Sequence, residues 1–256
     1  MTASPVSDLA LPAAMSIAAG LVGCFAVMRR MTLAADAISH VALPGIGLAL
    51  ALHLHPVAGG LAALLCGTVL IWALEHKTGI PTETIIGVVF SVALAVGSML
   101  TSGEELIEAL FGAPQSMGRL ETLLGLAGAL LVIGFVLRAR ERLVIALVSP
   151  DLARTVGIDV AHLDLLFLLA FALTVALGLR YLGVLLMGSL LIIPAATAKH
   201  LATSLKGMLL VATSVAALAT ALGLIAAQYL HVETGPLIIA VAGSMFFVSL
   251  LRRRVA

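Results

Sequence analysis

The stretch RRMTLAADAISHVALPGIGLAL, residues 29–50, places a carboxylate and an imidazole in a segment that is otherwise almost entirely apolar. Asp36 and His40 are four positions apart, just over one helical turn, so a helix through this segment carries both on one face. After Asp36 the next charged side chain is Glu75. So long an uncharged run predicts a membrane span, and a charge at the centre of a bilayer costs about 2.5–3.5 kcal/mol on insertion scales. The stretch therefore predicts a membrane protein in which these two side chains have a function.

The composition of the whole chain agrees with this prediction. Of its 256 residues, 62% are hydrophobic and 11% are charged, and the mean hydropathy is +1.21. Because a soluble domain carries about 25% charged residues, we expect an all-α polytopic membrane protein. The net charge of +1 indicates no class of partner. Cys24 and Cys66 lie in apolar runs, where free cysteine packs as a small hydrophobic residue.

Nine segments are candidate transmembrane helices, which need about 20 mostly apolar residues each. Their approximate limits are 9–28, 34–54, 57–75, 82–101, 121–138, 162–179, 182–198, 207–230 and 234–251. The shortest separations are the turn at His55-Pro56 and the junction around Arg180, and merging one of these pairs would leave eight spans. The chain shows no internal repeat and no extramembrane domain, so residues 1–256 are expected to form a single transmembrane domain.

The positive charges predict the orientation of these spans. With the N-terminus outside, twelve of the fourteen Lys and Arg residues fall on the inner side, and Arg119 and Arg180 fall on the outer side. The inner residues are Arg29, Arg30, Lys77, Arg138, Arg140, Arg142, Arg154, Lys199, Lys206, Arg252, Arg253 and Arg254. Because Lys and Arg are enriched in cytoplasmic loops, the sequence predicts an N-out, C-in topology. Eight spans would leave the last three arginines outside.

Asp36 and His40 have two interpretations. In one, Asp36 is an N-cap or first-turn acid that the helix dipole stabilises, and His40 is a hydrogen-bonded interior histidine. In the other, the pair binds an ion in transit, since ionisable residues inside membranes usually mark ion pathways. A carboxylate beside a neutral imidazole suits Zn, Mn or Fe better than an organic solute. Zinc usually takes four ligands, so two copies of the pair, facing across the two-fold axis of a symmetric dimer, would complete a site.

The inner loop, residues 139–161, contains a short predicted helix with the sequence SPDLARTVG, residues 149–157. Ser149 is a favoured N-cap, Pro150 suits the first helical position, and Asp151 complements the helix dipole. Gly157 can end the helix in a left-handed cap. We interpret this as a coupling helix for an ATPase, with an unpartnered surface helix as the alternative. The chain has no G-x-x-x-x-G-K-[ST] motif, so a separate chain would supply ATP hydrolysis.

Several separate segments, in order, resemble the permease subunits of bacterial ABC-type zinc and manganese importers, the ABC-3 family. They are RRMTLAADAISHVALPGIGLAL, TETIIGVVFSVALAVGSM, LFG, SPDLARTVGI and above all YLGVLLMGSLLIIPAATA, within about residues 20–250. The resemblance implies an ABC importer permease fold in the bacterial inner membrane. It also implies a homodimer, a cytoplasmic ABC ATPase and a periplasmic metal-binding protein as partners.

The resemblance also assigns roles to residues. In the family, the acid and histidine of the D-x-x-x-H segment are metal ligands in the pathway, and they correspond to Asp36 and His40 here. The coupling residues are then those of the inner loop: Ser149, Pro150, Asp151, Leu152, Ala153 and Gly157. The transported metal is expected to be zinc, with manganese or iron as alternatives, and no permanently bound cofactor is expected. SPDLA and LIIPAATA are closest to the zinc-type members.

Further residues are candidates for the lining of the pathway. Pro194 frees a backbone carbonyl within the span 182–198, and Ser189 and Thr197 lie beside it in the sequence, although packing explains them equally well. His53 and His55 lie near outer span ends, where histidines are also ordinary. Of the acids, Asp164 and Glu83 are interpreted as capping or dipole acids at inner span ends. Glu104, Glu105 and Glu108 form either a solvated acidic loop or a surface for the metal-delivering protein.

Two other functions compete with an ATP-driven importer. A stand-alone, ion-coupled secondary metal transporter would be expected to show inverted repeats and broken helices at the midplane, and neither is evident in the sequence. An intramembrane enzyme would need a catalytic motif, and no H-E-x-x-H is present. We therefore expect a transport subunit with no enzymatic activity of its own.

Overall fold

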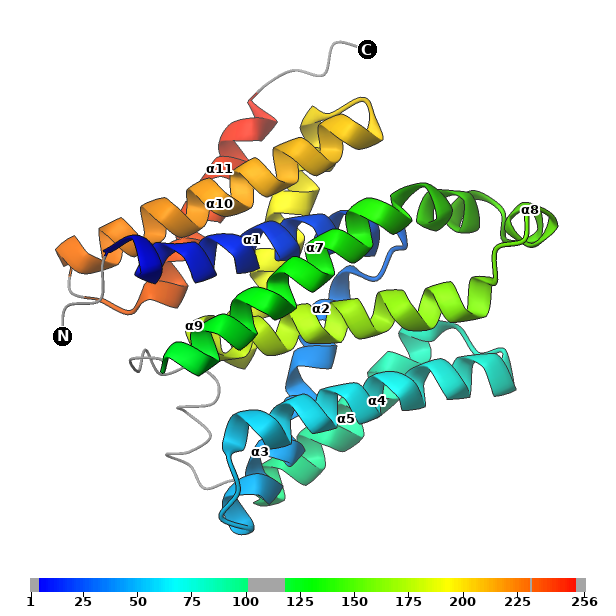
Figure 1. Ribbon diagram of the computed structural model, residues 1–256, viewed down its shortest axis with the longest axis horizontal. Helices are drawn as coiled ribbons and strands as arrows, with labels where there is room; N and C mark the ends of the chain where they lie inside the picture. The colour runs from blue at the N-terminus through cyan, green and yellow to red at the C-terminus, as the bar shows by residue number, and fades with distance from the viewer. Residues whose placement is uncertain (1–4, 101–117, 231, 252–256) are drawn as a thin grey trace.

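The computed structural model describes residues 5–100, 118–230 and 232–251, with side chains described throughout except at 5–9, 32, 33, 35, 36 and 180–186 (Figure 1). Every regular element within these ranges is an α-helix, as the composition predicts. The helices are α1 (Pro5–Met28), α2 (Thr32–His40), α3 (Ala42–Ala51), α4 (Pro56–Thr78), α5 (Thr82–Leu100), α7 (Arg119–Val148), α8 (Pro150–Thr155), α9 (Val160–Leu201), α10 (Leu205–Leu230) and α11 (Thr234–Leu250).

Within the described ranges, six helical segments are long and apolar enough to cross a membrane. They are Ala10–Met28, Pro56–Thr78, Thr82–Leu100, Arg119–Val148, Val160–Leu179 and Leu205–Leu230, and each coincides with one of the predicted spans. The segments Ala37–Ala51 and Thr234–Leu250 are shorter apolar helices. The remaining predicted span, 182–198, forms the second part of α9.

The predicted span 34–54 is broken. α2 ends at His40, Val41 links the two elements, and α3 begins at Ala42. The cause lies in the sequence, because Pro44 has no N–H to donate to the carbonyl four residues earlier, that of His40, and its ring crowds that carbonyl. The expectation that the chain has no broken helix was therefore wrong.

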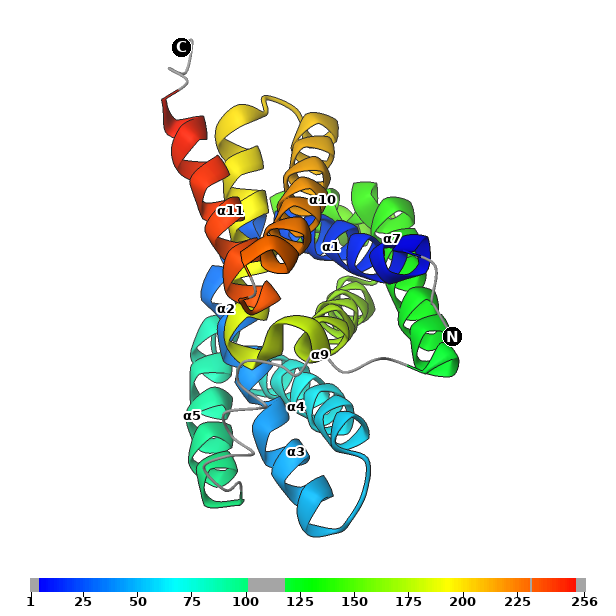
Figure 2. The same ribbon diagram turned by 90° about the vertical axis from the view of Figure 1, so that its left-hand side faces the viewer.

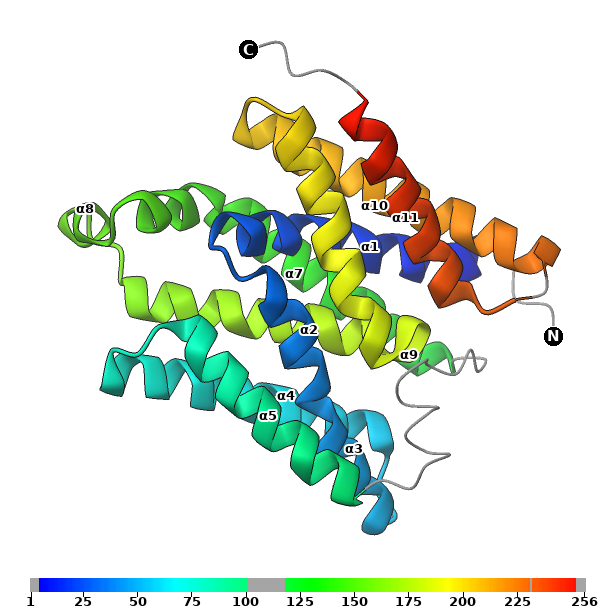
Figure 3. The same ribbon diagram turned by 180° about the vertical axis from the view of Figure 1, so that it is seen from behind.

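The predicted spans 162–179 and 182–198 belong to one continuous helix with a sharp bend. A straight helix of 42 residues would be about 63 Å long, twice the thickness of the hydrocarbon core. Figures 1 and 3 show instead two arms of α9 that meet at an angle. A Cβ on Gly178 would overlap the side chain of Met187, although nine residues of straight helix would separate their Cα atoms by about 13 Å. The chain thus turns back around the predicted junction at Arg180 without leaving helical geometry.

The helices form two groups joined by α2 (Figure 2). α1 packs against α7, α9 and α10, and α11 packs against α9 and α10, around the buried rings of Phe25, Phe167 and Phe171. In the second group α3 packs against α4 and α5. The backbones of α3 and α4 touch at Gly45 and Gly59, where a Cβ on either residue would overlap the carbonyl oxygen of the other. α2 contacts α9 on one side and α5 on the other.

Candidate functional site

The helix that carries Asp36 and His40 excludes one interpretation of the acid. Met31 precedes α2 as its N-cap, and the first turn of α2 contains no acidic residue. Asp36 lies one turn further in, so its interpretation as an N-cap or first-turn acid was wrong. The position of Asp36 on α2 is described, but its side chain lies outside the described part of the structure.

His40 is the last residue of α2 and stands directly at the helix break. Its side chain is half-buried, and its ring meets the ring of Phe90 on α5 edge to face, with centroids 5.4 Å apart. Ser39 and Ile38, the two residues before it, are buried. The imidazole is therefore held at the junction of α2, α3 and α5.

A broken helix suits ion binding at this position. Helix ends present backbone polar groups that have no partner within the helix, and transporters use such ends to bind substrate and ions inside the membrane. No group of three or more His, Cys, Asp or Glu side chains lies close enough to share a metal ion among the residues whose side chains are described. The carboxylate of Asp36 is outside that set. An imidazole and, four positions earlier in the sequence, a carboxylate are ligand types that suit a divalent transition metal.

The inner loop folds as its sequence predicts. The hydroxyl of Ser149 accepts a hydrogen bond from the Leu152 amide at 3.2 Å, and Pro150 occupies the first turn of α8. Gly157 has a φ of +77°. Its N–H bonds the Arg154 carbonyl at 3.1 Å, and the Ile158 N–H bonds the Ala153 carbonyl at 2.9 Å. These two bonds form a Schellman motif, which requires a residue in the left-handed conformation where glycine is unstrained.

One part of the exposed surface at α8 consists of apolar side chains, although exposed positions in solvent favour polar ones. Leu152 is 54% exposed and Val156 is 61% exposed, and Val148, at the end of α7, is 76% exposed. Ala153, on the opposite side of the helix, is fully buried. The α8 patch, which we define as Val148, Leu152 and Val156, is an apolar surface at the tip of a loop that two long helices support (Figure 1).

The start of α9 is stabilised by a cap and an ion pair. Asp159 is the N-cap, accepting hydrogen bonds from the His162 amide at 3.1 Å and from the His162 ring at 2.6 Å. The amide bond, followed by the ring bond, lowers the pKa of Asp159 below its ordinary value. Asp164 lies beyond the first turn of α9, so its interpretation as a capping acid was wrong. It is paired with Arg29, just after α1, at 2.7 Å. Glu83 lies in the first turn of α5, as predicted.

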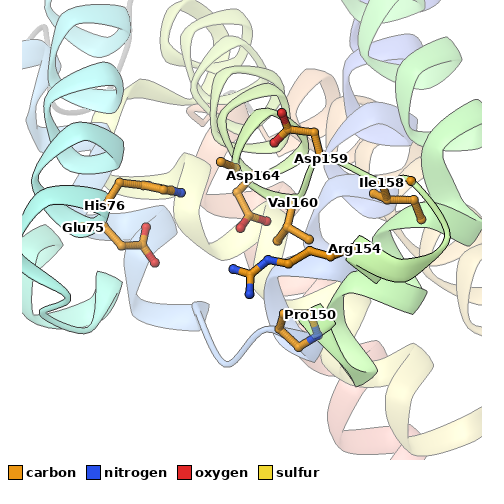
Figure 4. A pocket seen from close by; sticks show the side chains of 10 residues that line it. Glu75, His76, Pro150, Arg154, Ile158, Asp159, Val160 and Asp164 are labelled. Carbon is orange, nitrogen blue, oxygen red and sulfur yellow. The ribbon is translucent and has the colours of Figure 1, made fainter. Parts of the chain in front are cut away.

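A cavity of about 560 Å³ lies where α4 ends, between that helix, α8 and the start of α9 (Figure 4). Glu75 and His76 line it from α4, Arg154 from α8, and Asp159 and Asp164 from the start of α9. The sequence did not predict this cavity, because its walls are far apart in the chain and meet only through tertiary packing.

The structure separates the other predicted pathway residues. Pro194 and Thr197 are buried, and the Thr197 hydroxyl donates to the Ile193 carbonyl at 2.8 Å. Ser189 is half-buried. His53 and His55 are exposed around the turn between α3 and α4, with His53 at a φ of +55°. Glu104, Glu105 and Glu108 lie outside the described residues.

His55 makes one contact that the sequence analysis missed. The His55 ring approaches the carboxylate of Glu121, at the start of α7, to 3.8 Å. The sequence offered no signal for this contact, since the two residues belong to different helix ends. It shows that the α3–α4 turn and the start of α7 lie on the same side of the molecule.

Comparison with known proteins identifies the family. The ABC 3 transport family matches residues 7–253. The chain belongs to this family. The prediction that it is a permease of the ABC-type zinc and manganese importers is thus confirmed.

Individual relatives cover nearly the whole chain. The chain is 34% identical to the manganese import system permease protein ScaB of Streptococcus parasanguinis over 92% of its own length and 86% of that protein. It is 31% identical to the chelated iron transport system membrane protein YfeD of Yersinia pestis, over 97% and 86%. It is 29% identical to the high-affinity zinc uptake system membrane protein ZnuB of Haemophilus influenzae, over 93% and 94%.

A solved structure shares the fold. PsaBC from Streptococcus pneumoniae, determined in complex with a Fab, matches with a TM-score of 0.81 and 30% sequence identity. The match covers 94% of this chain and 89% of that chain. The overall fold of this chain is therefore shared with that structure.

Proposed function

We propose that this chain is the permease subunit of an ATP-driven importer that carries a divalent transition metal, Zn²⁺ in the first place, with Mn²⁺ or iron as alternatives, across the bacterial inner membrane. The observation that supports it is the position of His40 at the break between α2 and α3, one turn after Asp36. The relatives are named for manganese, iron and zinc, so their names do not separate these metals. The choice of zinc follows the sequence motifs.

The arrangement of helix ends supports the N-out, C-in orientation. Arg29, just after α1, and Trp72, near the end of α4, both contact the start of α9. His55 and Glu121, at the starts of α4 and α7, meet each other. Figure 1 shows the start of α1 and α8 at opposite ends of the long axis. The side that holds α8 thus also carries the predicted inner arginines and lysines next to α1, α4 and α7, as the positive-inside rule requires.

The partners follow from the same geometry. The α8 patch offers apolar side chains at the predicted cytoplasmic side, where a separate ABC ATPase would dock on the segment from Ser149 to Gly157. A second copy of the permease would bring a second Asp36 and His40, giving four ligands between the two chains. A periplasmic metal-binding protein would deliver the ion at the opposite side. The expected localisation is therefore the inner membrane, as a homodimer.

The test is uptake of radioactive zinc and manganese by cells that lack their own importer, with membrane levels of the permease measured on the same samples. Asp36→Asn keeps the size of the side chain and removes its charge, so uptake should be lost at a normal membrane level. As a control, Glu233→Gln makes the matching carboxylate-to-amide change at an exposed residue before α11, outside the proposed metal site and the docking segment, and should still give uptake. Uptake near the wild-type rate by Asp36→Asn would refute the ligand assignment.

A second experiment separates the importer from a secondary transporter. Because broken helices occur in secondary carriers, the break between α2 and α3 makes this alternative worth testing directly. The permease is placed in liposomes alone, and in parallel with its ATPase, ATP and the metal-binding protein. We expect metal uptake only in the second sample. Uptake by the permease alone, driven by an ion gradient, would establish the secondary mechanism instead.

A further inference from the structure

We infer that α4 connects the coupling helix α8 to the metal site, and that the indole of Trp72 is the joint between α4 and the start of α9. This inference rests on the proposed function, since it links the two sites named there. Three contacts along one helix carry it: Trp72 at the inner end, and Gly67 and Gly59 further along.

At the inner end, the Trp72 indole Nε1–H donates a hydrogen bond to the backbone carbonyl of Ala161, 3.0 Å away and 89 positions later in the chain. Ala161 is in the first turn of α9, two residues after the cap Asp159 and four after Gly157, where the α8 turn ends. A movement of α8 transmitted through this short connection therefore reaches α4 through the Trp72 hydrogen bond, next to the packing of α4 against α9.

Closer to the metal site, α4 touches the helix break itself. A Cβ placed on Gly67 would lie 2.6 Å from Cγ1 of Val41, the residue that links α2 to α3 directly after His40. Gly67 and Trp72 are five residues apart on the same helix, about 7.5 Å along its axis. Further along α4, Gly59 contacts the backbone of α3. No proline lies within α4 after its first position, so the helix has no built-in kink between these contacts.

The cavity next to Trp72 leaves room for this movement. Glu75 and His76 follow Trp72 on α4 and face the cavity, and Pro150 and Arg154 of α8 line its other side (Figure 4). The cavity of about 560 Å³ between these walls means that α8 and the end of α4 are not packed against each other there, whereas the Trp72 bond holds α4 to α9. The ion pair between Arg29 and Asp164 fixes the same part of α9 to α1.

The deciding experiment measures how much metal is transported per ATP. The wild-type complex is compared with Trp72→Phe, which keeps an aromatic ring and removes the N–H donor. We expect Trp72→Phe to bind metal like the wild type and to reach the membrane, with a several-fold lower ratio of metal transported to ATP hydrolysed. His76→Ala is the matched control, because its ring packs against Trp72 at 4.8 Å and lines the cavity, but is not the group that bonds Ala161. Its ratio should equal that of the wild type.

A ratio for Trp72→Phe equal to that of the wild type would overturn the inference. If Trp72→Phe fails to reach the membrane, fluorescence decides, because Trp72 is the single tryptophan of the chain. The purified permease is titrated with Zn²⁺ or Mn²⁺, and binding is measured with the radioactive metal. A shift in the emission maximum that saturates with binding, and persists in His76→Ala, supports the joint. Constant emission during saturable binding overturns it.

The same titration distinguishes a failure of the proposed function. If Asp36→Asn binds and transports metal like the wild type, the metal site lies elsewhere. The assignment of Asp36 as a metal ligand in the proposed function is then refuted. If Asp36→Asn loses binding while Trp72→Phe keeps the wild-type ratio, the proposed function stands and only the role of Trp72 is refuted.

Discussion

At the scale of single residues, His40 is the last residue of α2, and its ring contacts the ring of Phe90 on α5. The spacing of Asp36 and His40 predicts that both lie on one helix face, and both do lie on α2. The break behind His40 could also have been predicted, because Pro44 stands four positions later and removes the next helical hydrogen bond. The contact between His40 and Phe90 could not, because nothing local to either residue indicates that α5 returns beside α2.

His40 offers a graded test of metal binding. His40→Ala removes the imidazole, and we expect loss of uptake at a normal membrane level. His40→Gln restores hydrogen bonding but supplies an amide, which binds zinc weakly compared with imidazole, so it should rescue poorly. Radioactive metal uptake and membrane level are measured together. Full uptake by His40→Gln would show that His40 acts through hydrogen bonding or packing and is not a ligand.

Asp159 gives a prediction about pH at the start of α9. Hydrogen bonds from His162 lower the pKa of Asp159 in the folded state, so the cap stabilises the helix start above the ordinary Asp pKa of about 3.9. That contribution is lost as the pH falls through the lower, folded value. Hydrogen exchange at the amides of His162 and Leu163 should therefore stay slow down to about pH 4 in the wild type. Asp159→Ala should exchange faster at every pH, and equal rates in both proteins would contradict the cap.

At the scale of elements, α8 was predictable and α9 was not. The beginning and end of α8 depend on local signals, namely Ser149 and Pro150 at its start and Gly157 after its end, and each acts in the structure as predicted. The bend of α9 brings Gly178 and Met187 together, although they are nine positions apart, and α9 packs against α1 and α10, which are distant in the sequence. The sequence showed a polar residue at the junction and could not show whether the helix stops or bends there.

The α8 patch predicts the result of a charge substitution. Leu152→Glu places a carboxylate on an exposed apolar surface, so it should leave the permease folded and prevent apolar contact with the ATPase. We expect the variant to reach the membrane while ATPase stimulation and uptake both fall. The control is Lys206→Gln, which changes the charge at an exposed residue at the start of α10, outside the patch and the docking segment, and should leave stimulation and uptake unchanged. Normal ATPase stimulation by Leu152→Glu would remove α8 from the coupling mechanism.

Gly157 tests the same element through its backbone. At a φ of +77°, any L side chain costs about 1–2 kcal/mol in left-handed strain. Gly157→Ala should therefore weaken the Schellman motif and lower the transport rate more than Gly134→Ala, a glycine of α7 with open space around it. The thermal stability and uptake of the two variants are compared. Equal effects at both sites would show that the conformation of this turn does not matter for coupling.

At the scale of the whole molecule, the N-out, C-in orientation stays a prediction that rests on the positive charges. Six of the nine predicted spans coincide with described helices that are long and apolar enough to cross a membrane. The other three, 34–54, 182–198 and 234–251, coincide with α2–α3, the second part of α9 and α11. The grouping of the helices into two bundles around α2 depends on long-range packing, for which a single sequence carries no direct signal.

The orientation can be tested on the two faces directly with cysteine labelling. His55 is exposed at the predicted outer side and Leu152 at the predicted inner side. Each is replaced by cysteine in a Cys66→Ala background, since Cys66 is exposed and Cys24 is buried. A reagent that cannot cross membranes should label His55→Cys in intact spheroplasts and Leu152→Cys only after lysis, with no label on the Cys66→Ala parent. A reporter fused after Arg254, a residue outside the described part, should read cytoplasmic. Labelling of Leu152→Cys in intact spheroplasts would show that the topology is the reverse of the predicted one. The ATPase could then not dock on α8 from the cytoplasm.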